Sequence, residues 1–216
     1  MANILALESS GAICSACLII SGKIRTKYAD MNGNTHDRLL AEFIRRILED
    51  NKMKVENLDA VAVSAGPGSF TGLRIGASLA KALCFDNQPK LISVPTLNAI
   101  AFAAKEMANS SNFNKIAATI QSYKDQFYLQ YFDMELNPIS EISIEQVSEY
   151  QFNDEYFYAG YIKNEKQNHI NKYEQALDSE VIAHFAEEMF DKNEFIKSEE
   201  FTPLYVAEFV VKQGKS

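Results

Sequence analysis

The stretch that decides the fold is residues 64–76, Ser-Ala-Gly-Pro-Gly-Ser-Phe-Thr-Gly-Leu-Arg-Ile-Gly. It follows an apolar run at 58–64 that is typical of a buried strand. It leads into residues 71–85, whose small and apolar side chains predict a helix. A glycine-rich loop between a strand and a helix exposes backbone amides at the positive helix end, so this segment can bind an anion.

Two roles for this loop are open. The anion interpretation names as candidate contacts for phosphate or nucleotide Gly66, Gly68, Ser69, Thr71, Gly72 and Arg74. The loop is not a Walker A motif, because no Gly-Lys-Ser/Thr follows, and a GxGxxG pattern fails at Thr71. The structural interpretation is that the glycines allow a tight turn, while Gly72, Gly76 and Ala80 form a ridge for close helix packing. Judged from residue types alone, the structural role is favoured.

Hydrophobic periodicity outward from the loop predicts a regular order of elements. Strands are expected at 4–7, 13–20, 23–29, 58–64 and 91–94, and helices at 35–51, with Thr35 as N-cap, at 71–85 and at 96–107. The order β-β-β-α-β-α-β-α is an antiparallel meander followed by parallel crossovers. It predicts an α/β protein with a mixed sheet covered by helices.

The pattern restarts in reduced form after residue 115. Strands are expected near 116–122, 127–133, 139–144 and 157–159. Two domains follow, residues 1–108 and residues 109–216, with a C-terminal segment that can pack back on the first. Residues 161–200 are rich in Lys, Glu, Asn and Gln, so they are predicted to form solvated surface around an apolar helical patch at 181–185.

Composition and charge exclude several classes of protein. The chain has 216 residues and a net charge of −8; residues 1–100 carry 11 basic and 9 acidic side chains, leaving 10 and 20 in the remainder. An acidic half of this kind is a poor surface for nucleic acid. The apolar runs are too short to span a membrane and the first residues lack the features of a secretion signal, so a cytoplasmic location without membrane contact is expected.

No metal site or nucleophile is predicted. Cys14 and Cys17 have CxxC spacing, but residues three apart on a strand point to opposite faces, which favours core cysteines in a reducing compartment. The histidines His36, His169 and His184 form no metal-binding pair. No Ser-His-Asp set can be argued from spacing.

Taken together, several segments resemble the TsaB family, also called YeaZ. They are Ile4-Leu5-Ala6-Leu7-Glu8-Ser9-Ser10, Cys14-Ser15, Thr35-His36 with the helix after it, the loop at 66–76, Ala80-Lys81-Ala82-Leu83 and Val94-Pro95-Thr96-Leu97. The resemblance covers residues 1 to about 108. It implies two RNase H-like domains of the actin-like ATPase and hsp70 superfamily, the second reduced. It also implies a role in forming N6-threonylcarbamoyladenosine (t6A) at adenosine 37 of tRNAs that read ANN codons.

In that family the transfer step belongs to the paralogue TsaD. The resemblance therefore implies a non-catalytic subunit without a cofactor that pairs with TsaD and with the ATPase TsaE, and meets tRNA only indirectly. The alternative is a superfamily ATPase or a metallopeptidase-like enzyme (glycoprotease) acting alone. The positions of the His-x-x-x-His metal motif of TsaD fall on Thr96 and Ile100, which do not form a suitable pair of metal ligands. Glu8 stands where Asp is typical, at the phosphate-facing turn, and residues 121–124 replace a usual Asp-Ala-Arg.

The partner surface is expected on the helices at 35–51 and 71–85. Its candidate residues are Leu39, Leu40, Phe43, Ile44, Ile47, Leu73, Ala77 and Ala80. The first helix offers two apolar rows, one of 39, 43 and 47 and another of 40, 44 and 48, whereas one row suffices to pack on a sheet, so the second needs a partner. The alternative is that both rows are buried within the monomer. The same face can also pair with a second copy when TsaD is absent.

Overall fold

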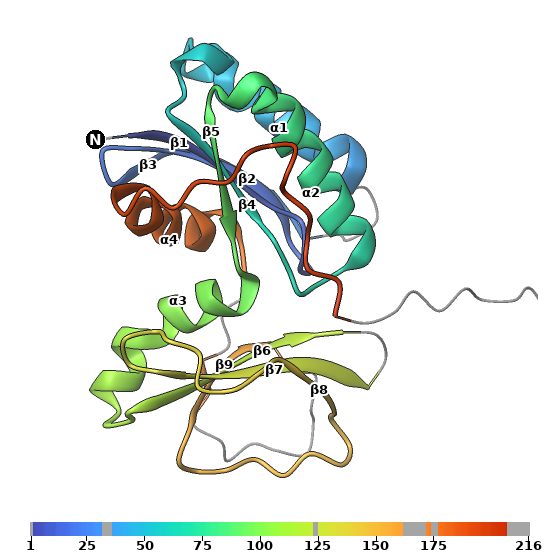
Figure 1. Cartoon of the computed structure of the whole chain (residues 1–216), viewed down its shortest axis with the longest axis vertical. Helices are drawn as coiled ribbons and strands as arrows, with labels where there is room; N and C mark the ends of the chain where they lie inside the picture. Colours follow the sequence, from blue (N-terminus) through green and yellow to red (C-terminus); the bar gives the residue numbers. More distant parts are fainter. Residues whose placement is uncertain (1, 32–35, 123–124, 162–171, 174–176, 207–216) are drawn as a thin grey trace, which may run out of the picture.

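Two five-stranded mixed sheets build the protein (Figure 1). The computed structural model describes residues 2–31, 36–122, 125–161, 172–173 and 177–206. The first sheet has the order β3-β2-β1-β4-β5 and the second β10-β9-β6-β7-β8. The predicted α/β class and mixed sheet are confirmed.

The first sheet has the predicted meander and crossovers. Its strands are β1 (Asn3–Glu8), β2 (Cys14–Ile20), β3 (Lys23–Asp30), β4 (Ala60–Ser64) and β5 (Lys90–Val94). β1 pairs antiparallel with β2 and parallel with β4, and β4 pairs parallel with β5. Because β1 and β4 are parallel neighbours, their carboxyl ends lie side by side at one edge of the sheet.

Helices cover both faces of this sheet. α1 (His36–Asp50) and α2 (Phe70–Leu83) lie on one face, while α3 (Thr96–Ser110) and α4 (Ser179–Asp191) lie between the two sheets (Figure 1). Two short 3-10 turns, η1 (Val55–Asn57) and η2 (Phe85–Asn87), follow α1 and α2. The predicted helices are confirmed, although Thr35, the expected N-cap of α1, lies outside the described residues. In the described part of the chain, no helix has the length and apolar character needed to cross a membrane.

The second sheet differs from expectation at two strands, because β8 begins late and the two-residue β10 was not predicted. Its members are β6 (Lys115–Gln121), β7 (Gln126–Asp133), β8 (Ser143–Gln146), β9 (Phe157–Tyr161) and β10 (Lys172–Tyr173). The strand predicted at 139–144 begins only at Ser143. Asn137 donates its backbone N–H to Asp133 Oδ1 at 2.8 Å, which closes a turn, and Pro138 next to it has no N–H for a ladder. The turn and the proline therefore delay regular pairing with β7.

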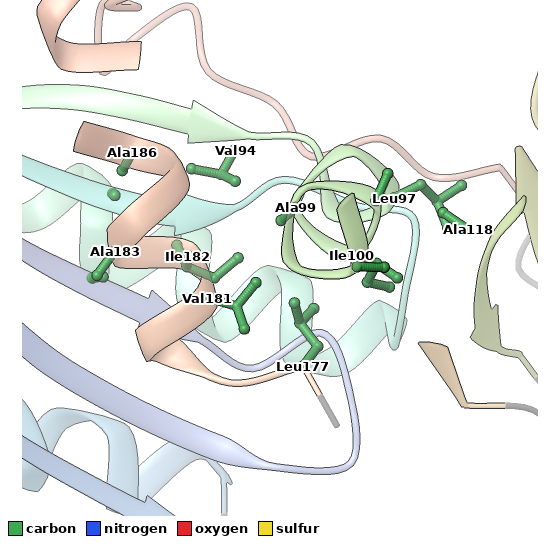
Figure 2. Packing of buried hydrophobic residues seen from close by; sticks show 14 of the residues in the cluster. Val94, Leu97, Ala99, Ile100, Ala118, Leu177, Val181, Ile182, Ala183 and Ala186 are labelled. Atoms are coloured by element: carbon green, nitrogen blue, oxygen red, sulfur yellow. The ribbon is translucent and has the colours of Figure 1, made fainter. Parts of the chain in front are cut away.

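The apolar helical patch predicted at 181–185 is confirmed, but the solvated surface expected around it is wrong for residues 179–191, which include further buried side chains. They form α4, whose side chains Val181, Ile182, Ala183 and Ala186 are buried against β1, β2, β4 and β5. Figure 2 shows Val181 and Ile182 on the side of α4 that faces α3, and Ala186 near Val94. The polar composition of the region as a whole conceals one short apolar stripe. The division of the chain at residue 108 stays a prediction, and α4 from the second half completes the cover of the first sheet.

Candidate functional site

The glycine-rich loop joins β4 to α2 and is tied to the start of α3. Gly66 donates its N–H to Thr96 Oγ1 at 3.0 Å, and Thr96 returns its own N–H to the Gly66 carbonyl at 2.9 Å. Gly66 has a φ of 100°, a conformation that glycine adopts without strain. The C-terminal segment also contacts the loop, because Leu204 donates to the Ala65 carbonyl at 2.7 Å.

The loop packs backbone against backbone. A Cβ on Gly68 would lie 2.6 Å from the Ser10 carbonyl oxygen, and one on Gly72 would overlap the Ser9 carbonyl oxygen. A Cβ on Gly66 would lie 2.5 Å from the carbonyl oxygen of Leu204. The glycines thus allow close approach of the turn after β1 and of the C-terminal segment. This packing accounts for the glycines without a ligand, and anion binding stays a prediction.

The first turn of α2 is capped by its own chain. Ser69 accepts the Gly72 N–H on its hydroxyl at 3.3 Å and donates its backbone N–H to the Ser10 carbonyl at 2.7 Å. The Arg74 guanidinium lies over the Phe70 ring at 4.0 Å, and that ring packs against Tyr205 at 4.9 Å. Of the predicted anion contacts, Ser69, Thr71 and Arg74 are solvent-exposed, Gly68 is half-buried, and Gly66 and Gly72 are buried.

Most of the predicted partner residues are buried within the monomer. Only Leu39 is half-buried; the buried members are Leu40, Phe43, Ile44, Ile47, Leu73, Ala77 and Ala80. Except for Leu73, they form one cluster with a face of the first sheet, so both rows of α1 already have internal partners. The double row therefore does not by itself require a second protein. That α1 and α2 contact a partner stays a prediction.

The exposed side of α2 was missed from the sequence. Ser78 and Ala82 are exposed there, Ile75 and Leu79 are half-buried, and Phe85 in the following turn is 81% exposed. Phe85 is the most exposed large apolar side chain among the described residues. The signal was present in the sequence: the ridge of Gly72, Gly76 and Ala80 faces inward, which places Ser78 and Ala82 on the outer side of the helix.

Glu8 ends β1 with no exposed surface. Its Oε1 accepts hydrogen bonds from Ser10 N at 2.6 Å, Ser10 Oγ at 2.8 Å and Gly11 N at 2.9 Å. Burial raises the pKa of Glu8 from its ordinary 4.5 to about 7, against the lowering effect of these hydrogen bonds. The side chain is enclosed by the turn that it supports.

The cysteines are core residues. Cys14 and Cys17 on β2 belong to separate core clusters on opposite faces of the sheet, as predicted. Burial raises the pKa of the Cys14 thiol to about 11 and that of Cys17 to about 12, so both stay protonated. Within the described residues there is no group of three or more His, Cys, Asp or Glu side chains that could hold a metal ion. His169 and residues 123–124 lie outside the described part.

Comparisons with known proteins place this geometry in a family. The family model described as "TsaD: tRNA N6-adenosine threonylcarbamoyltransferase" matches residues 30–193. A protein of Haemophilus influenzae named "tRNA threonylcarbamoyladenosine biosynthesis protein TsaB" is 33% identical over 126 residues, which are 58% of this chain and 52% of that protein. A protein of the same name from Buchnera aphidicola is 30% identical over 131 residues, 60% of this chain and 58% of its own length.

The aligned part of the chain thus spans little more than half the length of these curated relatives. Among solved structures, YeaZ from Pseudomonas aeruginosa superposes with a TM-score of 0.77 at 22% identity, covering 95% of this chain and 100% of that one. This likeness shows the fold.

Proposed function

Because the chain belongs to the TsaD family, and within it to the TsaB (YeaZ) proteins, we propose that it is a non-catalytic subunit required for t6A formation in tRNA. It binds TsaD, TsaE joins the pair, and TsaD performs the transfer of the threonylcarbamoyl group. The tRNA meets the assembly through TsaD. When TsaD is absent, the same face of this chain pairs with a second copy.

The two positions that match the metal motif of TsaD support a non-catalytic role. Thr96 is fully buried at the start of α3, and its hydroxyl accepts the Gly66 N–H. Ile100, one turn later, belongs to the apolar core between the sheets. Both side chains are therefore used in packing. An isoleucine has no donor atom for a metal ion, and a single threonine hydroxyl is a weak ligand.

The outer side of α2 is the observation that carries the partner role. Ser78 and Ala82 are small and exposed, which lets another helix approach closely. Ile75 and Leu79 offer apolar area beside them, and the exposed ring of Phe85 stands at the end of this surface. Because apolar residues remain on this side after the inner side has packed on the sheet, the surface fits a helical partner. α1 lies alongside and widens it (Figure 1).

Co-purification with TsaD tests the surface directly. The variants Phe85→Asp and Ala82→Asp place a charge on exposed positions, so they should reduce TsaD binding at least about tenfold while the protein stays folded. The matched control is Met107→Asp on α3, where a 50% exposed apolar side chain lies away from α2. Equal binding by all three variants and the unchanged protein would place the partner elsewhere.

Reconstitution tests the function itself. Purified TsaD, TsaE, tRNA, ATP and the enzyme that forms the threonylcarbamoyl adenylate are combined with and without this chain, and t6A is measured. Product only in its presence, with no product from the chain alone, is the expected result. Product formation that does not depend on the chain contradicts the proposal, and nucleotide hydrolysis or proteolysis by the chain alone would favour an independent enzyme.

A further inference from the structure

Buried polar side chains gather where β1 and β4 end. Glu8 on β1 pairs across the strands with Ser15 on β2, and Ser64 ends the neighbouring β4. Ser15 Oγ accepts the backbone N–H of Ser179, the first residue of α4, at 2.8 Å. Each of these four residues is at most 2% exposed. The cluster therefore lies inside the protein, at the junction of the first sheet with α4.

The hydrogen bonds of Glu8 are unequal between its two oxygens. Oε1 accepts three of them, from Ser10 N, Ser10 Oγ and Gly11 N. Among the described residues, neither Oε2 nor the Ser64 hydroxyl has a hydrogen-bond partner, although Ser64 acts on the same carboxyl and lowers its pKa. A neutral carboxylic acid accepts on its carbonyl oxygen and donates from the other. The observed pattern fits that form, with the proton on Oε2.

Among the residues that the structure describes, no cation acts on the Glu8 carboxyl. Within the described chain, the groups that act on Glu8 are the hydroxyls of Ser10 and Ser64 and the amides of Ser10 and Gly11. An unpaired carboxylate without solvent is costly, and burial raises the pKa of Glu8 to about 7.

The charged and titratable groups of the neighbouring elements supply no compensating positive charge to Glu8. Burial, and then the negative charges of Glu8 and of Asp30 on β3, raise the pKa of the Cys14 thiol on β2, so the thiol stays protonated. At the N-terminus of α4, Lys27 from β3 is engaged by Asp178 and Glu180. The neutral acid therefore remains the favoured form below about pH 7.

The turn that Glu8 holds also supports α2. Ser10, which donates twice to Glu8, accepts the N–H of Ser69, the N-cap of α2, at 2.7 Å. Ser9 donates its hydroxyl to the Gly72 carbonyl at 2.8 Å. Ser10 therefore links the Glu8 carboxyl directly to the N-cap of α2, so a change in the protonation of Glu8 acts on the first turn of the helix.

We propose that Glu8 is a proton-binding site at the junction of β1, α2 and α4: its Oε2 carries a proton in mildly acidic solution, and release of that proton as the pH rises through neutrality loosens the turn 9–11 and the first turn of α2. The proton passes to solvent and the carboxylate remains, so no other reactant is needed. This inference does not depend on the partner role and is tested without TsaD.

The first test follows the carboxyl itself in the full-length protein. Carbon-13 labelling of glutamate side chains and NMR from pH 4 to 9 should show one carboxyl signal with a midpoint near 7, absent from the Glu8→Gln variant. Titration of every glutamate near its ordinary value overturns the proposal. The test remains decisive even if Glu8→Gln does not fold, because the spectra of the unchanged protein alone show whether any glutamate carboxyl titrates near pH 7.

The second test measures the consequence. An acid with a raised pKa in the folded state loses its proton first in the unfolded chain, so stability falls between about pH 4.5 and 7 and stays low above. The melting temperature of the unchanged protein should fall about 5–10 °C more than that of Glu8→Gln between pH 5 and 8.5. Glu188→Gln, an exposed change on α4, should behave as the unchanged protein.

Hydrogen exchange separates local loosening from a uniform loss of stability. After correction for the intrinsic pH effect, the amides of Gly11 and Ser69 should exchange at least about tenfold faster at pH 8.5 than at pH 6, and equally in Glu8→Gln. Amides in the centre of β6 should change less. Identical pH profiles for the unchanged protein and Glu8→Gln overturn the proposal.

Discussion

α2 and α4 cover opposite faces of the same sheet, but only α4 is closed on its outer side. α4 lies between the two sheets, and its exposed surface includes the acidic Glu188 and Asp191. α2 presents Ser78 and Ala82 to solvent, with apolar side chains beside them. A helix whose inner side is packed and whose outer side is still small and apolar has the composition of an interface, whereas α4 has the composition of a core helix with a solvated rim.

The largest expected loss of stability comes from placing a charge on the inner side of α4. Ile182→Asp buries a carboxylate in the core between the sheets, so it should cost at least about 4 kcal/mol and leave little soluble protein. Urea unfolding and soluble yield measure the effect, with Glu188→Ala as a control near zero. Normal stability of Ile182→Asp would mean that α4 is not part of the core.

A smaller loss is expected at the inner side of α2. A Cβ on Gly72 overlaps the Ser9 carbonyl oxygen, so Gly72→Ala forces the helix away from the turn and should cost about 2–3 kcal/mol. Gly11→Ala is the matched control, because its Cβ meets atoms only at 3.8 Å or beyond. Chemical denaturation measures the free energy of unfolding of both variants. An equal loss of stability in the two would contradict close backbone packing at Gly72.

The smallest effect concerns the attachment of α4 to β3. Lys27 Nζ contacts Asp178 Oδ2 and Glu180 Oε2, the latter at 2.9 Å, at the first turn of α4. Lys27→Ala should cost only about 1 kcal/mol, because the helix N-terminus itself still favours these carboxylates. The loss should shrink in high salt, because salt screens the ion pairs. Lys23→Ala, exposed on the same strand, should change stability by less than about 0.5 kcal/mol. A salt-independent loss in Lys27→Ala would point to packing of its aliphatic stem instead.

The sequence predicted elements whose signal is local. The apolar runs of β1, β2 and β4, the helical spacing in α1, and the opposite faces of Cys14 and Cys17 all follow from residues close together in the chain. The strand near β8 was displaced because a turn at Asp133 and the missing N–H of Pro138 competed with its apolar pattern. The apolar helical patch at 181–185 was predicted, but the length and burial of α4 were not, because its stripe is diluted by the polar residues around it.

The candidate site was only partly predictable. The sequence predicted partner contacts on α1 and α2, yet most of the residues that it chose are buried. A helical stripe indicates that a side is apolar, but not whether the same chain covers it.

The sequence by itself determined the strand-loop-helix unit at 64–76, the meander before it, and the resemblance that points to t6A formation. Only the tertiary structure decided that Leu204 and the turn at Ser9 and Ser10 pack on the glycines, and that Glu8 is enclosed beside Ser64. The physical reason is that burial and the pairing of polar groups depend on segments more than fifty residues apart. Such contacts leave no periodic pattern along the chain, whereas a strand or a helix does.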